Sequence, residues 1–138
     1  MQNHTDLSRC KKIRVLIISD RLFDQAKALA EYLCRTEHIE VVGLAVNKQQ
    51  TLRIAQEYAF DYLIIAGYLK AELTYGVITE LKKQQKKFLA VQWSMLDSLI
   101  TDYCERYKIP LKFERTRLME DFVNFLEAHV NDPIPTNL

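Results

Sequence analysis

Apolar residues gather in five short runs along the chain, and a longer stretch of different periodicity follows each run. The first and third runs are nearly uninterrupted and rich in branched residues, which is typical of strands buried on both faces of a parallel sheet. The fifth run is short and less apolar, which predicts an edge strand. The five runs are Ile13–Ile18, Glu40–Val46, Tyr62–Ala66, Phe88–Trp93 and Leu111–Phe113.

The stretches between the runs carry apolar residues at intervals of three and four, which predicts helices with one buried face. In the first stretch, Leu22, Ala26, Leu29 and Leu33 fall on one such face. Asn47 or Thr51 is suited to begin the second helix, because short polar side chains cap helix N-termini. The expected helices begin near Arg21 and then cover about 47–60, 71–85, 98–107 and 118–130.

Five strands that alternate with five helices predict an α/β fold of the flavodoxin type, with an open parallel sheet between two helical layers. The expected strand order is 2-1-3-4-5, with right-handed crossovers and a site at the carboxyl ends of the first and third strands. We expect one domain over residues 13–130, a lead-in over 1–12 and an extended tail over 131–138.

Composition narrows the class of protein. The 138 residues carry a net charge of only +1, so no strong field favours nucleic acid or membrane surfaces as partners. Three cysteines without paired spacing favour a reducing, cytoplasmic location. The chain shows neither a signal-peptide core nor a run of about 20 apolar residues that would span a membrane.

The residues expected at the carboxyl edge offer little catalytic chemistry. The first loop, SDRLFD, contains no glycine to close around a phosphate. His4, His38 and His129 lie away from this edge, so no base is placed beside a nucleophile. We therefore expect no enzymatic activity and no cofactor.

Several segments, in order, resemble the response-regulator receiver domain. RVLIISD is similar to the first strand of that family and its acidic pair, and DYLII is similar to its third strand. TYGVITELKKQ resembles the helix that follows, and Ser94 matches the switch serine or threonine after the fourth strand. The resemblance covers about residues 13–130 and implies a signalling function.

In that family an aspartate after the third strand accepts a phosphoryl group, and the acidic pair holds Mg²⁺, which prefers clustered oxygen ligands. Here the acceptor position falls on Ala66 when counted forward from Asp61 and on Tyr68 when counted back from Gly76. Neither residue is a carboxylate, and nor is Gly67 between them. The acidic pair is reduced to Ser19 and Asp20, so we expect no metal site, with Asp20 at most a weak ligand. The resemblance is therefore to an atypical receiver, a pseudo-receiver.

Structural roles are available for the residues that survive at this edge. Asp20 is placed to cap the first helix or to pair with a basic residue of the fifth strand. That basic residue is Lys112 if the strand is aligned, or Arg115 if the last helix is aligned. Ser94 is placed to cap a turn.

Two surfaces invite a binding role. Five aromatic residues near the last two helices either anchor an interface or fill the core; these are Tyr103, Tyr107, Phe113, Phe122 and Phe125. Lysines at 82, 83, 86 and 87 fit a solvated helix C-terminus better than a phosphate-binding patch.

The leading hypothesis is a signalling domain that acts through protein–protein contacts without aspartyl phosphorylation. Its partner is unknown, and a homodimer through the helix 98–107, the fifth strand and the helix 118–130 is one form it could take. The alternative is a small-molecule-binding domain with a pocket at the carboxyl edge, in which Trp93 would stack on the ligand. That pocket would be lined by Asp20, Tyr68, Trp93, Ser94 and Arg115.

Overall fold

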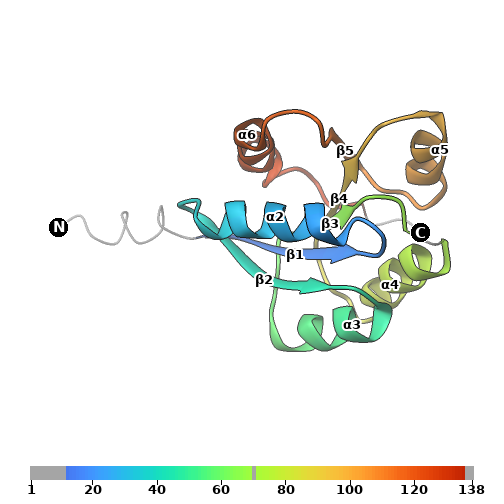
Figure 1. Ribbon diagram of the computed structural model, residues 1–138. Coiled ribbons are helices and arrows are strands. Elements are labelled where there is room, and N and C mark those ends of the chain that lie inside the picture. The colour runs from blue at the N-terminus through green and yellow to red at the C-terminus, as the bar shows by residue number, and fades with distance from the viewer. Residues whose placement is uncertain (1–11, 70, 136–138) are drawn as a thin grey trace.

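The computed structural model describes residues 12–69 and 71–135 (Figure 1), and for residues 71–75 only the backbone. The five expected strands and five expected helices are all present, and no end is shifted by more than three residues. The elements are β1 (Ile13–Ser19), α2 (Phe23–Cys34), β2 (Ile39–Ala45), α3 (Lys48–Glu57), β3 (Tyr62–Ala66), α4 (Ala71–Lys83), β4 (Leu89–Ser94), α5 (Ser98–Arg106), β5 (Leu111–Glu114) and α6 (Met119–His129).

Most of the expected lead-in over 1–12 and the end of the tail lie outside the described residues. His4, Cys10 (one of the three cysteines) and Lys70 (after the third strand) lie outside them as well. In the described part of the chain, no helix combines the length and apolar character that crossing a bilayer requires.

The strands form one parallel sheet in the order β2-β1-β3-β4-β5, which confirms the predicted flavodoxin-like topology. Ile17 pairs with Ile64, and Ile64 pairs with Val91 in the centre of the sheet. Because all five strands run in one direction, the loops that follow them gather at one edge, as expected for this topology. That carboxyl edge carries the candidate site.

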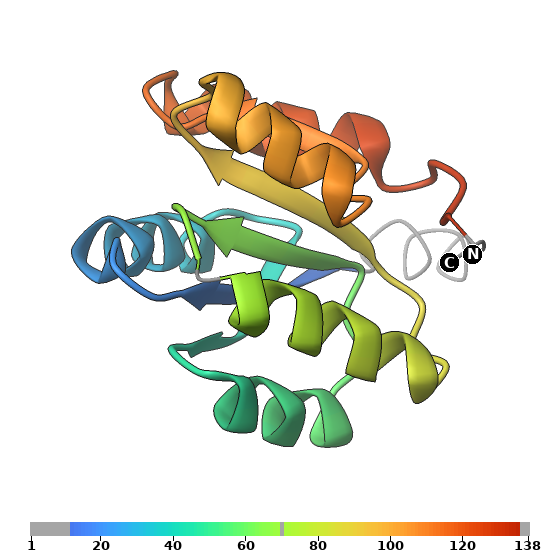
Figure 2. The same cartoon turned by 90° about the vertical axis from the view of Figure 1, so that its right-hand side faces the viewer.

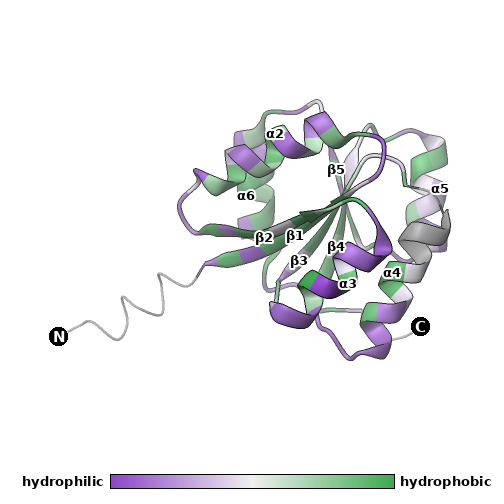
Figure 3. Cartoon of the chain, turned by 60° about the horizontal axis from the view of Figure 1, so that its bottom comes forward, coloured by the Kyte–Doolittle hydropathy of each residue, from purple (hydrophilic) through white to green (hydrophobic). Residues whose placement is uncertain are grey.

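Side chains alternate between two cores, one on each face of the sheet. Val15 and Ile17 face the layer formed by α2 and α6. Leu16 and Ile18 face the layer formed by α3, α4 and α5. Figure 3 shows the hydrophobic strands between these helical layers, and Figure 2 shows α3 and α4 side by side on their face.

The helix starts decide one structural role. Asn47 caps α3 as expected, since its side-chain oxygen accepts a 2.8 Å hydrogen bond from the Gln50 amide. The expectation that Asp20 caps the first helix is wrong. Helix α2 begins at Phe23, and its N-cap residue is Leu22, which makes no side-chain capping bond. Asp20 lies two residues too early to reach the free amides of the first turn.

Candidate functional site

The residue that leaves β3 is Gly67, in a conformation that only glycine adopts without strain. Its φ is +90°, and its amide donates a 2.9 Å hydrogen bond to the Trp93 carbonyl. A Cβ added at this position would lie 2.9 Å from Leu22 Cβ, well inside van der Waals contact. The loop after β1 thus packs directly on the exit of β3, and no carboxylate side chain fits there.

The residues on either side of Gly67 do not supply an acceptor either. Ala66 ends β3 and is fully buried in the core on the α2 and α6 face. Tyr68 is 45% exposed, and its ring lies 5.2 Å from the ring of Tyr103 on α5. The two positions that align with the aspartate of the resembled family therefore hold the packed methyl group of Ala66 and the aromatic ring of Tyr68, with a glycine between them.

A buried glutamine, which the sequence analysis did not single out, fixes this exit. Gln92 on β4 donates from Nε2 to the Gly67 carbonyl at 2.6 Å and to Ser94 Oγ at 3.2 Å. Its Oε1 finds no hydrogen-bond partner among the described residues. The only sequence signal was a polar residue inside the apolar run FLAVQW, where a side chain facing the core needs a partner.

Ser94 is the last residue of β4 and is buried. Its hydroxyl donates to the neighbouring Met95 carbonyl at 3.3 Å, besides accepting from Gln92. The expected turn-capping role is thus only part of its bonding. Ser94 also belongs to a polar chain that runs from Gly67 through Gln92 to the start of the β4–α5 loop.

The degenerate acidic pair lies at the end of β1. Ser19 is fully buried, and its Oγ finds no hydrogen-bond partner among the described residues. Asp20 is half-buried and forms no ion pair with Lys112 or Arg115, so the expected salt bridge is wrong. The physical reason is the strand order, which places β3 and β4 between β1 and β5, a separation of roughly 14 Å.

The two basic candidates of the last strand take different positions. Lys112 pairs in register with Gln92 in the middle of β5 and lines a cavity beside α5. Arg115 follows the strand, and its amide donates a 3.0 Å hydrogen bond to the Ser94 carbonyl. Arg115 is therefore the basic residue at the carboxyl edge.

Glu114 is a second residue that the sequence analysis missed. It pairs in register with Ser94, and its Oε1 accepts a 2.9 Å hydrogen bond from the Leu96 amide. Its Oε2 accepts a 3.2 Å bond from the Thr116 hydroxyl. The Glu114 carboxylate thus joins the β4–α5 loop to the β5–α6 loop. Nothing in a four-residue edge strand marked it in advance, because the role depends on register.

The resembled family holds a divalent cation at this edge, and the residues present here do not fit one. Mg²⁺ demands several oxygen ligands in near-octahedral geometry. Asp20 is the only carboxylate at the end of β1, and Glu114 is committed to backbone and hydroxyl donors three strands away. In residues 12–69 and 71–135, no three His, Cys, Asp or Glu side chains are grouped to hold a metal ion.

Most of the candidate interface aromatics fill the core, which was one of the two interpretations left open. Tyr103 is buried and donates from its hydroxyl to the Leu69 carbonyl at 2.8 Å. Phe113 and Phe122 are buried, with ring centroids 4.9 Å apart. Only Tyr107 and Phe125 keep partial exposure.

The lone tryptophan is also a core residue. Trp93 is buried, and its ring centroid lies 6.3 Å from that of Phe122 on α6. The expectation that Trp93 stacks on a ligand at the carboxyl edge is therefore wrong, because its side chain faces the α2 and α6 layer.

Exposed apolar side chains concentrate at the carboxyl edge. Of the large exposed ones in the described residues, Tyr58 and Ile134 lie elsewhere, and the rest follow the ends of the five strands. We call these others the apolar rim: Phe23, Val46, Tyr68, Met95, Leu99 and Leu118. Large apolar groups that gather at one edge mark a surface suited to contact with another molecule.

Comparison with solved structures shows which known proteins share this fold. No protein-family model matches the chain, and no curated protein matches its sequence. The signal receiver domain of NarL from Mycobacterium tuberculosis superposes with a TM-score of 0.72 at 13% identity, covering 89% of this chain and 99% of that one. A two-component response regulator from Clostridium difficile gives a TM-score of 0.69 at 13% identity, covering 88% and 98%.

A third similar structure was solved in the presence of a phosphorylation mimic. The isolated receiver domain of RcsB from Salmonella enterica serovar Typhimurium, solved with the phosphomimetic BeF₃⁻, has a TM-score of 0.67 at 14% identity. The match covers 92% of this chain and 94% of that domain. The fold is thus that of response-regulator receiver domains, and the low identity leaves site chemistry to be argued from this chain's own residues.

Proposed function

We propose that this protein is a receiver-like signalling domain that acts through protein–protein contacts and does not depend on aspartyl phosphorylation. The observation that carries the proposal is the packing of Leu22 against Gly67, which lies between the two positions that align with the acceptor of the resembled family, Ala66 and Tyr68. Phosphoryl transfer requires a carboxylate positioned for in-line attack beside a cation. Ala66, Gly67 and Tyr68 supply no carboxylate at the exit of β3, and Asp20 is the only carboxylate at the end of β1.

The apolar rim supports the second half of the proposal. Met95 and Leu99 bracket the start of α5, and Leu118 precedes α6. These three exposed side chains lie at one end of the α5, β5 and α6 surface. We therefore place the contact of the proposed homodimer at this end. Exposed apolar residues contribute most when they are buried centrally in an interface.

Sedimentation at increasing protein concentration tests this contact. We expect the wild type to self-associate and the double variant Leu99→Asp, Leu118→Asp to remain monomeric at the same concentrations. Tyr58→Asp is the matched control, because Tyr58 is an exposed aromatic away from the rim. A wild type that stays monomeric throughout would contradict the homodimer, and equal loss in the control would contradict the rim as its location.

A further inference from the structure

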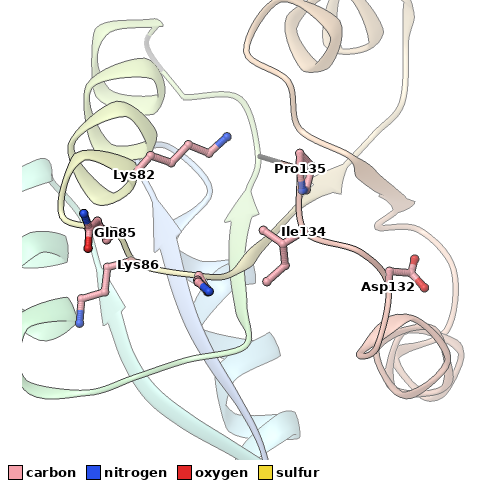
Figure 4. A pocket seen from close by; sticks show the side chains of 7 residues that line it. Lys82, Gln85, Lys86, Asp132, Ile134 and Pro135 are labelled. Atoms are coloured by element: carbon pink, nitrogen blue, oxygen red, sulfur yellow. The ribbon is translucent and has the colours of Figure 1, made fainter. Parts of the chain in front are cut away.

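A cavity of about 550 Å³ lies at the edge of the sheet opposite to the apolar rim. Lys82, Lys86 and Lys87, at the end of α4, line one side. Ile134 and Pro135, in the segment after α6, line the other side (Figure 4). Its volume is within the range of small-molecule sites in proteins, about 300–1,000 Å³.

The backbone at the end of α4 holds the three lysines together. Gln85 adopts a left-handed φ of 62°, and the Lys86 amide donates a 3.0 Å hydrogen bond to the Leu81 carbonyl. This closure stops the helix and turns the chain towards β4. Lys86 and Lys87 consequently follow Lys82 around one tight turn instead of continuing along a helix.

The positive charge of this cavity is not neutralised within the described chain. None of Lys82, Lys86 and Lys87 forms an ion pair with a described residue. The lining carboxylate, Asp132, has its Oδ2 2.7 Å from His129 Nδ1. Figure 4 shows the Lys82 side chain extended towards Pro135, with the Asp132 carboxylate pointing away from it.

A further lysine adds to the positive charge around this cavity. Lys108, at the end of α5, shares a small adjoining hollow with Lys82. Burial lowers the pKa of the Lys82 ammonium, and the nearby charge of Lys108 lowers it further. A helix C-terminus alone would have the opposite effect, because its partial negative charge favours a cation. The helix C-terminus and the charge of Lys108 therefore act on the Lys82 ammonium in opposite directions.

We propose that this cavity binds a small organic phosphate, with its anionic groups on Lys82 and Lys86 and its apolar part against Ile134 and Pro135. Two or more negative charges would offset the uncompensated lysines, and phosphate oxygens accept charge-assisted hydrogen bonds from ammonium groups. A cavity of this size in a chain of net charge +1 favours a small anion over an extended polyanion such as nucleic acid. This site is independent of the proposed protein contact, since the two lie at opposite edges.

Amide chemical-shift titrations with ADP, pyrophosphate and adenosine test the proposal. We expect ADP to cause saturable shifts over residues 82–87 and 132–135 with a dissociation constant below about 1 mM. Pyrophosphate should shift the same lysine segment more weakly, and adenosine should not bind. The double variant Lys82→Gln, Lys86→Gln should weaken ADP binding by at least about tenfold.

Two controls keep the test decisive. Lys27→Gln with Lys48→Gln removes two exposed lysines from other helices, and binding should be unchanged. Ile134→Asp places a carboxylate in the cavity and should abolish ADP binding, whereas Ile134→Ala should only weaken it. The absence of saturable shifts, retained affinity in the Lys82 and Lys86 variant, or an equal loss in the Lys27 and Lys48 variant would overturn the proposal.

Discussion

The side-chain amide of Gln92 donates a 2.6 Å hydrogen bond to the backbone carbonyl of Gly67. Both groups are buried and cannot hydrogen-bond to water, so each depends on the other as a hydrogen-bond partner. It holds the peptide after β3 in the orientation that its positive φ requires, while Leu22 covers the other side. The exit of β3 is thereby built as a packed turn and not as an open anion site.

A carboxylate placed at this exit by Gly67→Asp should destabilise the fold and should not create a cation site. An aspartate at φ +90° is strained, and its Cβ would meet Leu22 at 2.9 Å. We expect a loss of about 2–4 kcal/mol in the free energy of unfolding, measured by urea denaturation.

The matched control is Gly76→Ala within α4. The added Cβ would meet only the side chain of Lys48, at 3.4 Å or more. Alanine is favoured over glycine in a helix, so stability should rise by about 0.5–1 kcal/mol. A Gly67→Asp protein as stable as the wild type would contradict the packed-turn interpretation.

The variant Gln92→Leu should cost about 1–3 kcal/mol, because the buried Gly67 carbonyl loses its side-chain donor. The loop after β3 should also lose protection in hydrogen exchange before the sheet does. Gln84→Leu is the control, since Gln84 is exposed and bonds only to Glu80 at 3.4 Å. Equal protection of Gly67 in the wild type and in Gln92→Leu would disprove the role assigned to Gln92.

Removal of the Glu114 carboxylate by Glu114→Ala should free the β4–α5 loop. The Leu96 amide would lose its 2.9 Å acceptor, with an expected cost of about 1–2 kcal/mol. Faster amide exchange at Leu96, with unchanged exchange in the centre of β4, is the specific signature. Glu105→Ala on the exposed face of α5 should leave both properties unchanged.

A buried tyrosine links the sheet to α6 and gives a pH-dependent prediction. Tyr62 donates from its hydroxyl to the Leu126 carbonyl at 2.6 Å, so Tyr62→Phe should cost about 1 kcal/mol near neutral pH. Burial raises the pKa of the Tyr62 hydroxyl, and Asp132 and Asp61 raise it further. The folded protein therefore keeps this proton at a pH where the unfolded chain has lost it.

The direction of the pH dependence follows from the linkage between proton binding and folding. With the folded pKa raised, the contribution of Tyr62 is complete below the ordinary tyrosine pKa of about 10 and declines as the pH rises above it. The stability difference between wild type and Tyr62→Phe should accordingly shrink between pH 7 and about pH 11, measured by urea denaturation. A difference that stays constant over this range would show that the Tyr62 hydroxyl ionises alike in both states, and a difference that grows would show that folding lowers its pKa.

The sequence predicted the architecture because periodicity reports burial directly. Uninterrupted, β-branched apolar runs such as Tyr62–Ala66 are typical of strands buried on both faces, and the alternation with helices then limits the topology. The missing carboxylate was also visible in the sequence, because it depends only on which residues stand at the exit of the third strand. The predicted strand order also implied the distance between Asp20 and Lys112, which excludes their ion pair.

The parts that escaped prediction depend on register and on side-chain direction. Glu114 acts through its position opposite Ser94, and Gln92 acts through the carbonyl of a residue 25 positions earlier. The aromatic residues of the last two helices were ambiguous because a wide apolar face fits either a core or an interface. Three-dimensional packing assigned Tyr103, Phe113 and Phe122 to the core.

We infer that the exit of β3 binds neither a cation nor a phosphoryl group. Backbone amide shifts followed during addition of Mg²⁺, and then of beryllofluoride, test it most directly. A receiver domain that retains its aspartate serves as the positive control in the same buffer. Our account predicts no saturable shift at Asp20, Gly67 or Ser94 while the control responds. Saturable, Mg²⁺-dependent shifts that converge on Asp20 and Ser94 would contradict it.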